Sequence, residues 1–247
     1  MKILIIQNIA RESPGLIGEL LNEKGYKFDI FDANEKNFPN PSEYDAVFAL
    51  GGPDSANDKT QKMMNELRLI MEIIDAQIPF FGVCLGMQAL VKAAGGEVYQ
   101  NQAREIGCKD DDRAYYEIDL TEEGKNDRIL SGMKSPFKIF HLHGETVGLK
   151  HGMKLLGTGK HCTNQIVKID KNAYGVQGHL EVTEFILKKW LDEDSMFENF
   201  DKKIVMDDFK SIKNEYRDNG IRLLSNFLDL AENSEKKTSK IISSMAE

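Results

Sequence analysis

Hydrophobic residues in the first 95 positions follow two alternating patterns. Short apolar runs at residues 2–6, 27–31, 45–50 and 80–83 predict four buried strands. Apolar residues spaced three or four apart predict two amphipathic helices, through Leu16, Ile17, Leu20 and Leu21 and through Met63, Leu67, Ile70, Met71 and Ile74. Strands that alternate with helices favour an α/β fold with an open, mostly parallel sheet and helices on both faces.

The pattern changes after Gly95-Gly96. Four strand-like runs follow without helices between them, at residues 114–120, 137–142, 154–157 and 165–169. We therefore expect an antiparallel extension of the same domain. A last strand is expected at residues 173–177, and Phe185, Ile186 and Trp190 begin another helix.

Charged residues become frequent from about Asp192. Apolar spacing then predicts two amphipathic helices, one through Val205, Phe209, Ile212 and Tyr216 and one through Leu223, Leu224, Phe227, Leu228 and Leu230. Asn219-Gly220 should separate them. We divide the chain into a domain at residues 1–192 and a helical C-terminal extension at residues 193–247, which packs on the main domain or on a partner. Residues 234–247 are expected to fray.

Composition narrows the class of protein. The chain has 247 residues, of which 41% are hydrophobic, so it can bury a sizeable core. Its net charge of −8 does not favour nucleic acid or an anionic membrane surface as a partner. Cys84, Cys108 and Cys162 have neither a disulfide-framework spacing nor a metal-ligand spacing, so we expect no metal. No segment has the pattern of a signal peptide or a membrane span, which favours the cytoplasm.

The fourth expected strand leads into Gly82-Val83-Cys84-Leu85-Gly86 and then into a helical stretch. This is the pattern of a nucleophile elbow with cysteine in place of serine. A sharp strand-to-helix turn presents the nucleophile, and the flanking glycines let the backbone close around it. The start of a helix also favours a thiolate. Taken alone, the pattern around Cys84 also fits a buried cysteine that only packs against its neighbours.

A cysteine nucleophile needs a base and an orienting carboxylate. Among five histidines, His179 follows the last expected strand and lies two residues before Glu181, so an extended turn places both side chains on one side. An oxyanion needs N–H donors, for which Leu85, directly after Cys84, and Gly51-Gly52-Pro53, after the third strand, are candidates. Each feature by itself also fits an ordinary surface pair or turn.

Together and in this order, Gly51-Gly52-Pro53, residues 82–88 and residues 175–181 resemble the three main motifs of class I glutamine amidotransferases, the type with a Cys-His-Glu triad. The resemblance covers roughly residues 1–192 and implies a flavodoxin-like fold. Glu105-Ile106-Gly107 and residues 141–147 are similar to a stand-alone branch that resembles the amidotransferase domain of GMP synthetase.

The resemblance implies the catalytic roles. Cys84 would be the nucleophile, His179 the base and acid, and Glu181 the orienting carboxylate. The N–H groups of Gly52 and Leu85 would form the oxyanion hole. The implied reaction releases ammonia from glutamine through a γ-glutamyl thioester and needs no cofactor. The ammonia would pass to an acceptor, such as a separate synthetase subunit, and formation of a homo-oligomer stays open.

The resemblance also implies the substrate contacts. Gln88 would contact the glutamine, and His143-Gly144-Glu145 would hold its amino-acid end. The chain departs from the family pattern at three places. Gly178 stands where an aromatic residue is usual, Leu180 where proline is usual, and Glu145 where aspartate is common. None of these changes removes a catalytic group, but the first two are expected to loosen the His179 loop.

Two other functions stay open. The same triad would serve a γ-glutamyl peptidase, and the altered His179 loop is compatible with a catalytically inactive relative kept as a binding or regulatory protein. Gly51-Gly52-Pro53-Asp54-Ser55 also resembles the ATP pyrophosphatase loop S-G-G-x-D-S. We reject that third interpretation because Leu50 replaces the first serine and the motif follows the third strand. The acceptor protein is then expected to be a separate one.

Overall fold

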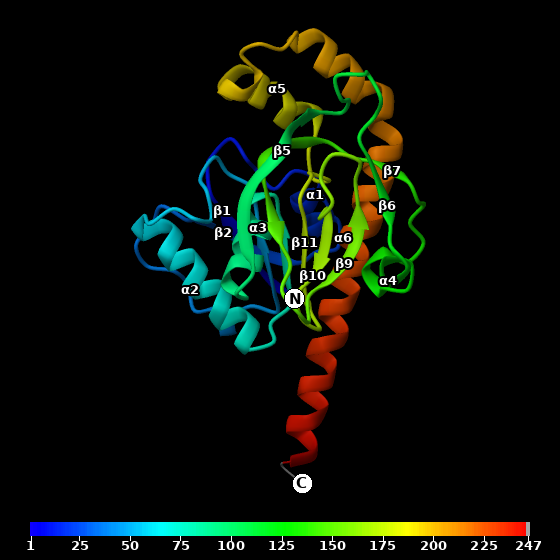
Figure 1. The fold of residues 1–247 in the computed structure, drawn as a ribbon. Helices are drawn as coiled ribbons and strands as arrows, with labels where there is room; N and C mark the ends of the chain where they lie inside the picture. Colours follow the sequence, from blue (N-terminus) through cyan, green and yellow to red (C-terminus); the bar gives the residue numbers. More distant parts are fainter. Residues whose placement is uncertain (246–247) are drawn as a thin grey trace.

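The computed structural model describes the backbone of residues 1–245 and the side chains of residues 1–234. At its centre is a nine-stranded sheet in the order β2-β1-β3-β4-β11-β10-β9-β6-β7 (Figure 1). Five neighbouring strands are parallel: β2 (Lys27–Asp32), β1 (Lys2–Gln7), β3 (Ala46–Ala49), β4 (Phe80–Val83) and β11 (Ala173–Val176). Four more extend the sheet by antiparallel pairing: β10 (Ile166–Lys168), β9 (Lys154–Thr158), β6 (Glu117–Leu120) and β7 (Phe137–Lys138). The predicted parallel sheet and its antiparallel extension are confirmed.

A separate antiparallel ribbon is formed by β5 (Glu97–Gly107) and β8 (His141–Gly148). The sequence patterns missed β5, because most of its side chains are polar and exposed, as at Arg104, and so give no regular apolar alternation. The expectation of a single strand at residues 137–142 is wrong, because this segment contributes to two different strands. Its first part belongs to β7 in the main sheet, and its last part begins β8 in the ribbon.

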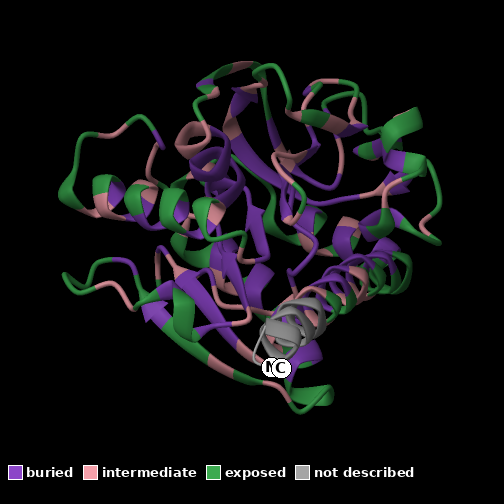
Figure 2. Cartoon of the chain, turned by 90° about the horizontal axis from the view of Figure 1, so that it is seen from below, coloured by how far each residue is buried: buried purple, intermediate pink, exposed green. Residues whose placement is uncertain are grey.

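Helices cover both faces of the sheet, as predicted. They are α1 (Leu16–Glu23), α2 (Gln61–Asp75), α3 (Leu85–Ala93), α4 (Glu122–Lys125), α5 (Glu184–Glu193) and α6 (Lys202–Met245), with 3-10 turns η1 (Pro41–Glu43), η2 (Arg128–Leu130) and η3 (Ser195–Phe197). In β1, Ile3 and Ile5 belong to the same core as α1, α5 and α6, whereas Leu4 and Ile6 belong to the core with α2 and α3. This alternation is expected of a strand buried on both faces. Figure 2 shows the buried strands enclosed by helices with exposed outer sides.

The C-terminal segment differs from the prediction of two helices. One continuous helix, α6, passes through Asn219 and Gly220, so the expected break there is wrong. Gly220 allows a close approach instead, since a Cβ at this position would lie 2.5 Å from the carbonyl oxygen of Leu180. Glycine inside a helix costs only about 1 kcal/mol relative to alanine, which tertiary packing offsets. Of residues 234–247, which were expected to fray, those as far as Met245 belong to this helix, and residues 246–247 lie outside the described residues.

Helix α6 contributes to the main core. The ring of Phe227 packs against Phe48 of β3 and Phe81 of β4, with ring centroids 5.2 and 5.3 Å away. Packing of the C-terminal extension on the main domain is therefore confirmed, and the division at residue 192 stays a prediction. Within the described part of the chain, every helix is too short or too polar to cross a bilayer.

Candidate active site

The turn between β4 and α3 holds Cys84 in a strained conformation. Its φ of 51° and ψ of −108° lie where residues other than glycine are rarely found. Gly82 and Gly86 close the turn, since a Cβ on Gly82 would lie 2.4 Å from the Gly86 backbone. The Cys84 N–H donates to the carbonyl oxygen of Val176 on β11 at 2.8 Å. The predicted strand-to-helix elbow is confirmed.

His179 and Glu181 follow directly after β11, the strand that pairs with β4. Because the carboxyl ends of neighbouring parallel strands meet at one edge of a sheet, this topology brings the pair to Cys84. Nδ1 of His179 lies 2.7 Å from Oε1 of Glu181, and both side chains are buried. The contact that the H-x-E spacing predicted is therefore present.

The charges around His179 favour its protonated form. Burial lowers the pKa of His179, but the Glu181 carboxylate and the Cys84 side chain more than compensate and raise this pKa well above its ordinary value. Nε2 of His179 has no hydrogen-bond partner among the described residues. The ring can therefore hold a proton close to the thiol, which is the arrangement that activates a cysteine nucleophile.

Neighbouring elements fix the backbone and ring of His179. Its N–H donates to the carbonyl oxygen of Phe140 at 2.7 Å, and its own carbonyl oxygen accepts from the Tyr216 hydroxyl of α6 at 2.9 Å. The Trp190 ring of α5 packs edge-on against the imidazole, with centroids 4.8 Å apart. The C-terminal helices thus hold the candidate base in place, which the sequence patterns did not suggest.

Local packing compensates for the two departures near His179. A Cβ on Gly178 would lie only 2.9 Å from Nδ1 of His141, so the His141 ring fills the space that a side chain at position 178 would need. Leu180 is buried, and its N–H donates to Oε2 of Glu181 at 3.0 Å. A proline at position 180 would have no N–H to donate. Both departures are therefore accommodated by specific contacts of the loop, and the loosening expected from them stays a prediction.

Gly52 and Leu85, the expected oxyanion donors, lie on segments that touch. Gly52 follows β3, Leu85 begins α3, and a Cβ on Gly52 would lie 3.1 Å from the Leu85 side chain. The first N–H groups of a helix have no partner within the helix, so the N–H of Leu85 is suited to an oxyanion. The geometry is compatible with the expected oxyanion hole, which stays a prediction.

Gln88 lies one helical turn after Cys84 and is buried rather than solvated. Its Nε2 donates to the carbonyl oxygen of Glu145 at 3.2 Å and to Oε1 of Gln177 at 3.3 Å. Nε2 of Gln177 in turn lies 3.9 Å from Sγ of Cys84. Gln177 was part of a recognised motif, but sequence reasoning gave it no role. The structure makes it a direct neighbour of the nucleophile.

The backbone of β8 also lies beside the nucleophile. The carbonyl oxygen of Leu142 is 3.8 Å from Sγ of Cys84. Of the expected substrate-binding residues, His143 places its ring against Glu105, and Gly144 lies beside the Arg104 side chain. The Glu145 carboxylate accepts a hydrogen bond from Gln100 at 3.2 Å. A role of these residues in holding glutamine stays a prediction.

Sequence reasoning missed Glu12, which lies in the loop after β1. A Cβ on Gly51 would be 2.2 Å from Oε2 of Glu12 and 3.1 Å from Cε1 of His179. The side chains of Glu12 and His179 therefore both pack against the Gly51 backbone. Burial raises the pKa of Glu12 to about 7, although His179 opposes this shift. A lone acidic residue between Arg11 and Ser13 carries no periodicity or motif, so only the fold could identify it.

The other two cysteines have a different environment from Cys84. Like Cys84, both Cys108 and Cys162 are buried and free, but their thiols have raised pKa values. Burial raises the pKa of Cys162 to about 11 and also raises that of Cys108. Neither lies at a strand-to-helix elbow, which agrees with the prediction that Cys84 alone is the nucleophile.

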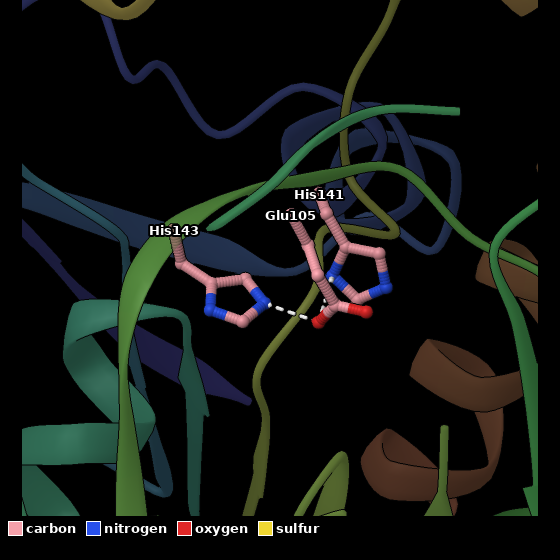
Figure 3. Close-up of side chains that lie close together, drawn as sticks. All are labelled: Glu105, His141 and His143. Carbon is pink, nitrogen blue, oxygen red and sulfur yellow. Dashed lines mark ion pairs between the residues drawn. The ribbon is translucent and has the colours of Figure 1, made fainter. Parts of the chain in front are cut away.

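A second buried cluster joins Glu105 of β5 to His141 and His143 of β8 (Figure 3). Glu105 pairs directly with His143 across the ribbon, and His141 lies two residues away, so the three side chains share a face. Nε2 of His143 lies 2.8 Å and Nδ1 of His141 lies 3.9 Å from Oε2 of Glu105. Burial lowers the pKa of His141 to about 3. The sequence contained the H-x-H spacing, but it did not place Glu105 opposite.

Comparison with known proteins agrees with this site. The family model described as glutamine amidotransferase class-I matches residues 15–196. The chain is 29% identical over 190 residues to the glutamine amidotransferase-like protein YfeJ of Salmonella typhimurium, which covers 74% of this chain and 77% of that protein. It is 30% identical over 190 residues to the GMP synthase of Thermosipho melanesiensis. That match covers 74% of this chain but spans only 33% of the synthase.

Solved structures extend the likeness to nearly the whole chain. A glutamine amidotransferase of Thermotoga maritima aligns with a TM-score of 0.82 at 26% identity, covering 92% of this chain and 97% of that one. A glutamine amidotransferase of Methylobacillus flagellatus aligns with a TM-score of 0.80 at 23% identity, covering 92% of this chain and 94% of that one. The second likeness concerns the fold alone. The predicted fold class is confirmed.

Proposed function

The chain belongs to the class I glutamine amidotransferase family, and on this basis we propose that it hydrolyses the side-chain amide of glutamine and releases ammonia. One observation carries the proposal. Cys84, in its strained turn after β4, meets the buried His179–Glu181 pair after β11. A thiol, a base and an orienting carboxylate in contact are the requirements of nucleophilic amide hydrolysis.

The reaction proceeds in two stages. Sγ of Cys84 attacks the amide carbon of glutamine, and the N–H groups of Gly52 and Leu85 stabilise the negative oxygen that forms. His179, oriented by Glu181, gives its proton to the leaving ammonia as the C–N bond breaks. Water then attacks the γ-glutamyl thioester while His179 accepts a proton. Glutamate leaves, and the Cys84 thiol is restored.

The ammonia needs an acceptor. The Thermosipho relative is a glutamine-hydrolysing GMP synthase, of which this chain spans one third. We extend only the glutamine-hydrolysing part to this chain, and we propose that a separate synthetase subunit or another acceptor takes the ammonia. Because Cys84 has to stay reduced, we place the protein in the cytoplasm.

The decisive experiment measures glutamate release from glutamine, with and without candidate acceptors, for the wild type and for Cys84→Ala. Loss of the nucleophile should reduce turnover by at least about 10³-fold. Cys108→Ala is the matched control and should keep wild-type turnover. Release of glutamate from γ-glutamyl dipeptides but not from glutamine would identify a γ-glutamyl peptidase instead.

Labelling separates an enzyme from an inactive relative. A glutamine-mimicking electrophile should modify Cys84 well ahead of Cys108 and Cys162, because Cys84 lies beside the protonated His179, whereas burial raises the pKa of the other two thiols. If Cys84 reacts no faster than Cys108 and Cys162, even with acceptors present, the protein is a binding module and the proposed activity is wrong.

A further inference from the structure

The cluster of Glu105, His141 and His143 lies outside the catalytic triad (Figure 3). We infer that these side chains form a binding site for a divalent transition-metal ion, with Zn²⁺ the best match. Each residue provides one ligand atom, and two imidazoles with one carboxylate are a common zinc donor set. The inference does not depend on the proposed hydrolase activity.

The hydrogen bonding of His143 leaves one ring nitrogen for a ligand. Nδ1 lies 3.0 Å from the carbonyl oxygen of Glu145, which can only accept, so Nδ1 carries the proton. Nε2 has no assigned hydrogen-bond partner among the described residues, although Oε2 of Glu105 lies 2.8 Å away. In the neutral ring, Nε2 therefore presents a lone pair beside a buried carboxylate. A cation bound there would satisfy both groups.

His141 provides the second nitrogen. Its Nδ1 is buried, has no hydrogen-bond partner in the part of the chain that the structure describes, and lies 3.9 Å from Oε2 of Glu105. Ligand atoms on a tetrahedral zinc ion, each about 2.1 Å from the metal, are roughly 3.4 Å from one another. The distances of Oε2 to the two ring nitrogens, 2.8 and 3.9 Å, lie on either side of that value, and all three ligand atoms lie within 4.8 Å of one another. Small side-chain rotations would complete the coordination.

The surrounding hydrogen bonds are those of metal-bound side chains. A histidine that binds a metal usually donates its other N–H to a carbonyl oxygen, and a carboxylate that binds a metal usually accepts a hydrogen bond. His143 bonds the Glu145 carbonyl, and Oε2 of Glu105 accepts from Nε2 of Gln165 at 2.9 Å. Oε1 of Gln165 is buried, has no hydrogen-bond partner within the described side chains, and offers a further oxygen beside the cluster.

The site would stabilise one wall of the candidate active site. Its ligands come from both strands of the ribbon, so a bound ion would link β5 to β8. Leu142, between the two histidines, points its carbonyl oxygen at Sγ of Cys84. His141 also packs against Gly178, the residue before His179. A metal ion here would therefore fix backbone groups on both sides of the nucleophile.

Zinc binding to the full chain tests the inference directly. Metal-free wild-type protein should bind one equivalent of Zn²⁺ in calorimetric titration and show a higher Tm with Zn²⁺. Co²⁺ should give the visible absorption of a four-coordinate N/O site. Glu105→Gln and His143→Gln should each weaken Zn²⁺ binding at least tenfold. His161→Gln is the matched control and should bind normally, since His161 pairs with Asp110 outside the cluster.

A competing arrangement has no metal. A doubly protonated His143 would form an ion pair with Glu105, and nitrogen NMR of the histidine rings distinguishes the two states. A metal site requires that Zn²⁺ shift the signals of His141 and His143 but not that of His161. If His143 carries two ring protons and Zn²⁺ changes neither these signals nor Tm, the inference is overturned. These measurements need only the wild-type protein and no glutamine, so they are independent of variant folding and of the proposed activity.

Discussion

Two buried pairs of histidine and glutamate lie near Cys84, and they differ in what the remaining ring nitrogen faces. Nδ1 of His179 is 2.7 Å from Glu181, and Nε2 of His143 is 2.8 Å from Glu105. The first pair comes from one segment after a parallel strand and leaves Nε2 available beside the thiol. The second pair links two antiparallel strands, and the remaining nitrogen of His143, Nδ1, donates to the carbonyl oxygen of Glu145 at 3.0 Å. Residue type and spacing therefore do not set the role of such a pair.

The structural elements that hold the two histidines in place also differ. His179 is held by Trp190 and Tyr216 of the C-terminal helices. His143 is held within its own ribbon and by the carbonyl oxygen of Glu145. We therefore expect substitutions in the first pair to act on the chemical step and substitutions in the second to act on local structure and ligand binding.

The largest effect is expected for His179→Asn compared with His143→Asn. Loss of the base should lower kcat by at least about 10³-fold, because an asparagine side chain cannot take up and return the proton that His179 carries beside the thiol. His143→Asn should act mainly on the KM for glutamine, because its ring supports the β8 backbone. Steady-state glutamate release measures both. Equal losses of kcat in the two variants would contradict the distinction between the pairs.

Glu181→Gln should have the next largest effect. The amide still accepts a hydrogen bond but loses the charge that orients the ring and stabilises the imidazolium, so kcat should fall by about 10²- to 10⁴-fold. Labelling of Cys84 by a glutamine-mimicking electrophile should slow but persist, because the imidazole remains. Glu105→Gln is the control, with a much smaller loss of kcat. Complete loss of labelling in Glu181→Gln would show that the carboxylate holds the thiol site together rather than tuning His179.

Glu12→Gln should have a smaller effect that depends on pH. The pKa of Glu12 is about 7, so its carboxyl becomes negative beside His179 as the pH rises through neutrality. The charged groups that face it are Arg11, His179, Glu181 and Asp194. The negative charge of Glu12 favours the protonated form of His179. Removal of this charge in Glu12→Gln should change kcat/KM by less than about tenfold, and only above neutral pH. If the pH profiles of kcat/KM for the variant and the wild type superimpose, Glu12 takes no part in the reaction.

The smallest effect on turnover is expected for Glu66→Gln in α2, far from either pair in sequence. Burial raises the pKa of Glu66 to about 7, against about 4.3 in an unfolded chain. The folded state thus binds the proton more tightly, so this contribution to stability is complete below about pH 4 and is lost as the pH rises through 7.

The glutamine side chain can keep the hydrogen bond from Asn8, which is 3.1 Å long with glutamate. Glu66→Gln should therefore raise the free energy of unfolding by about 1–3 kcal/mol at about pH 8 and change it little at about pH 4. Urea denaturation at the two pH values measures this difference. A variant that is less stable than the wild type at the higher pH would show that the carboxylate is stabilised there by another group.

The sequence by itself determined the features that depend on local pattern. Alternating apolar runs predicted the parallel strands and α1 to α3, because burial on both faces of a sheet demands such runs. The glycines around Cys84 predicted the elbow, and the two-residue spacing of His179 and Glu181 predicted their contact. Each of these depends on residues within about ten positions of one another along the chain, so no knowledge of long-range packing was needed.

Only the tertiary structure decided what depends on distant segments. It kept α6 continuous through Gly220, because packing against Leu180 outweighs the weak helix propensity of glycine. It placed Glu12 against His179 and Glu105 opposite His143, and neither pairing leaves a periodic signal in the sequence. The roles of buried polar groups are set by the partners they meet in the fold, since burial without a partner is costly and the partner lies far away in the chain.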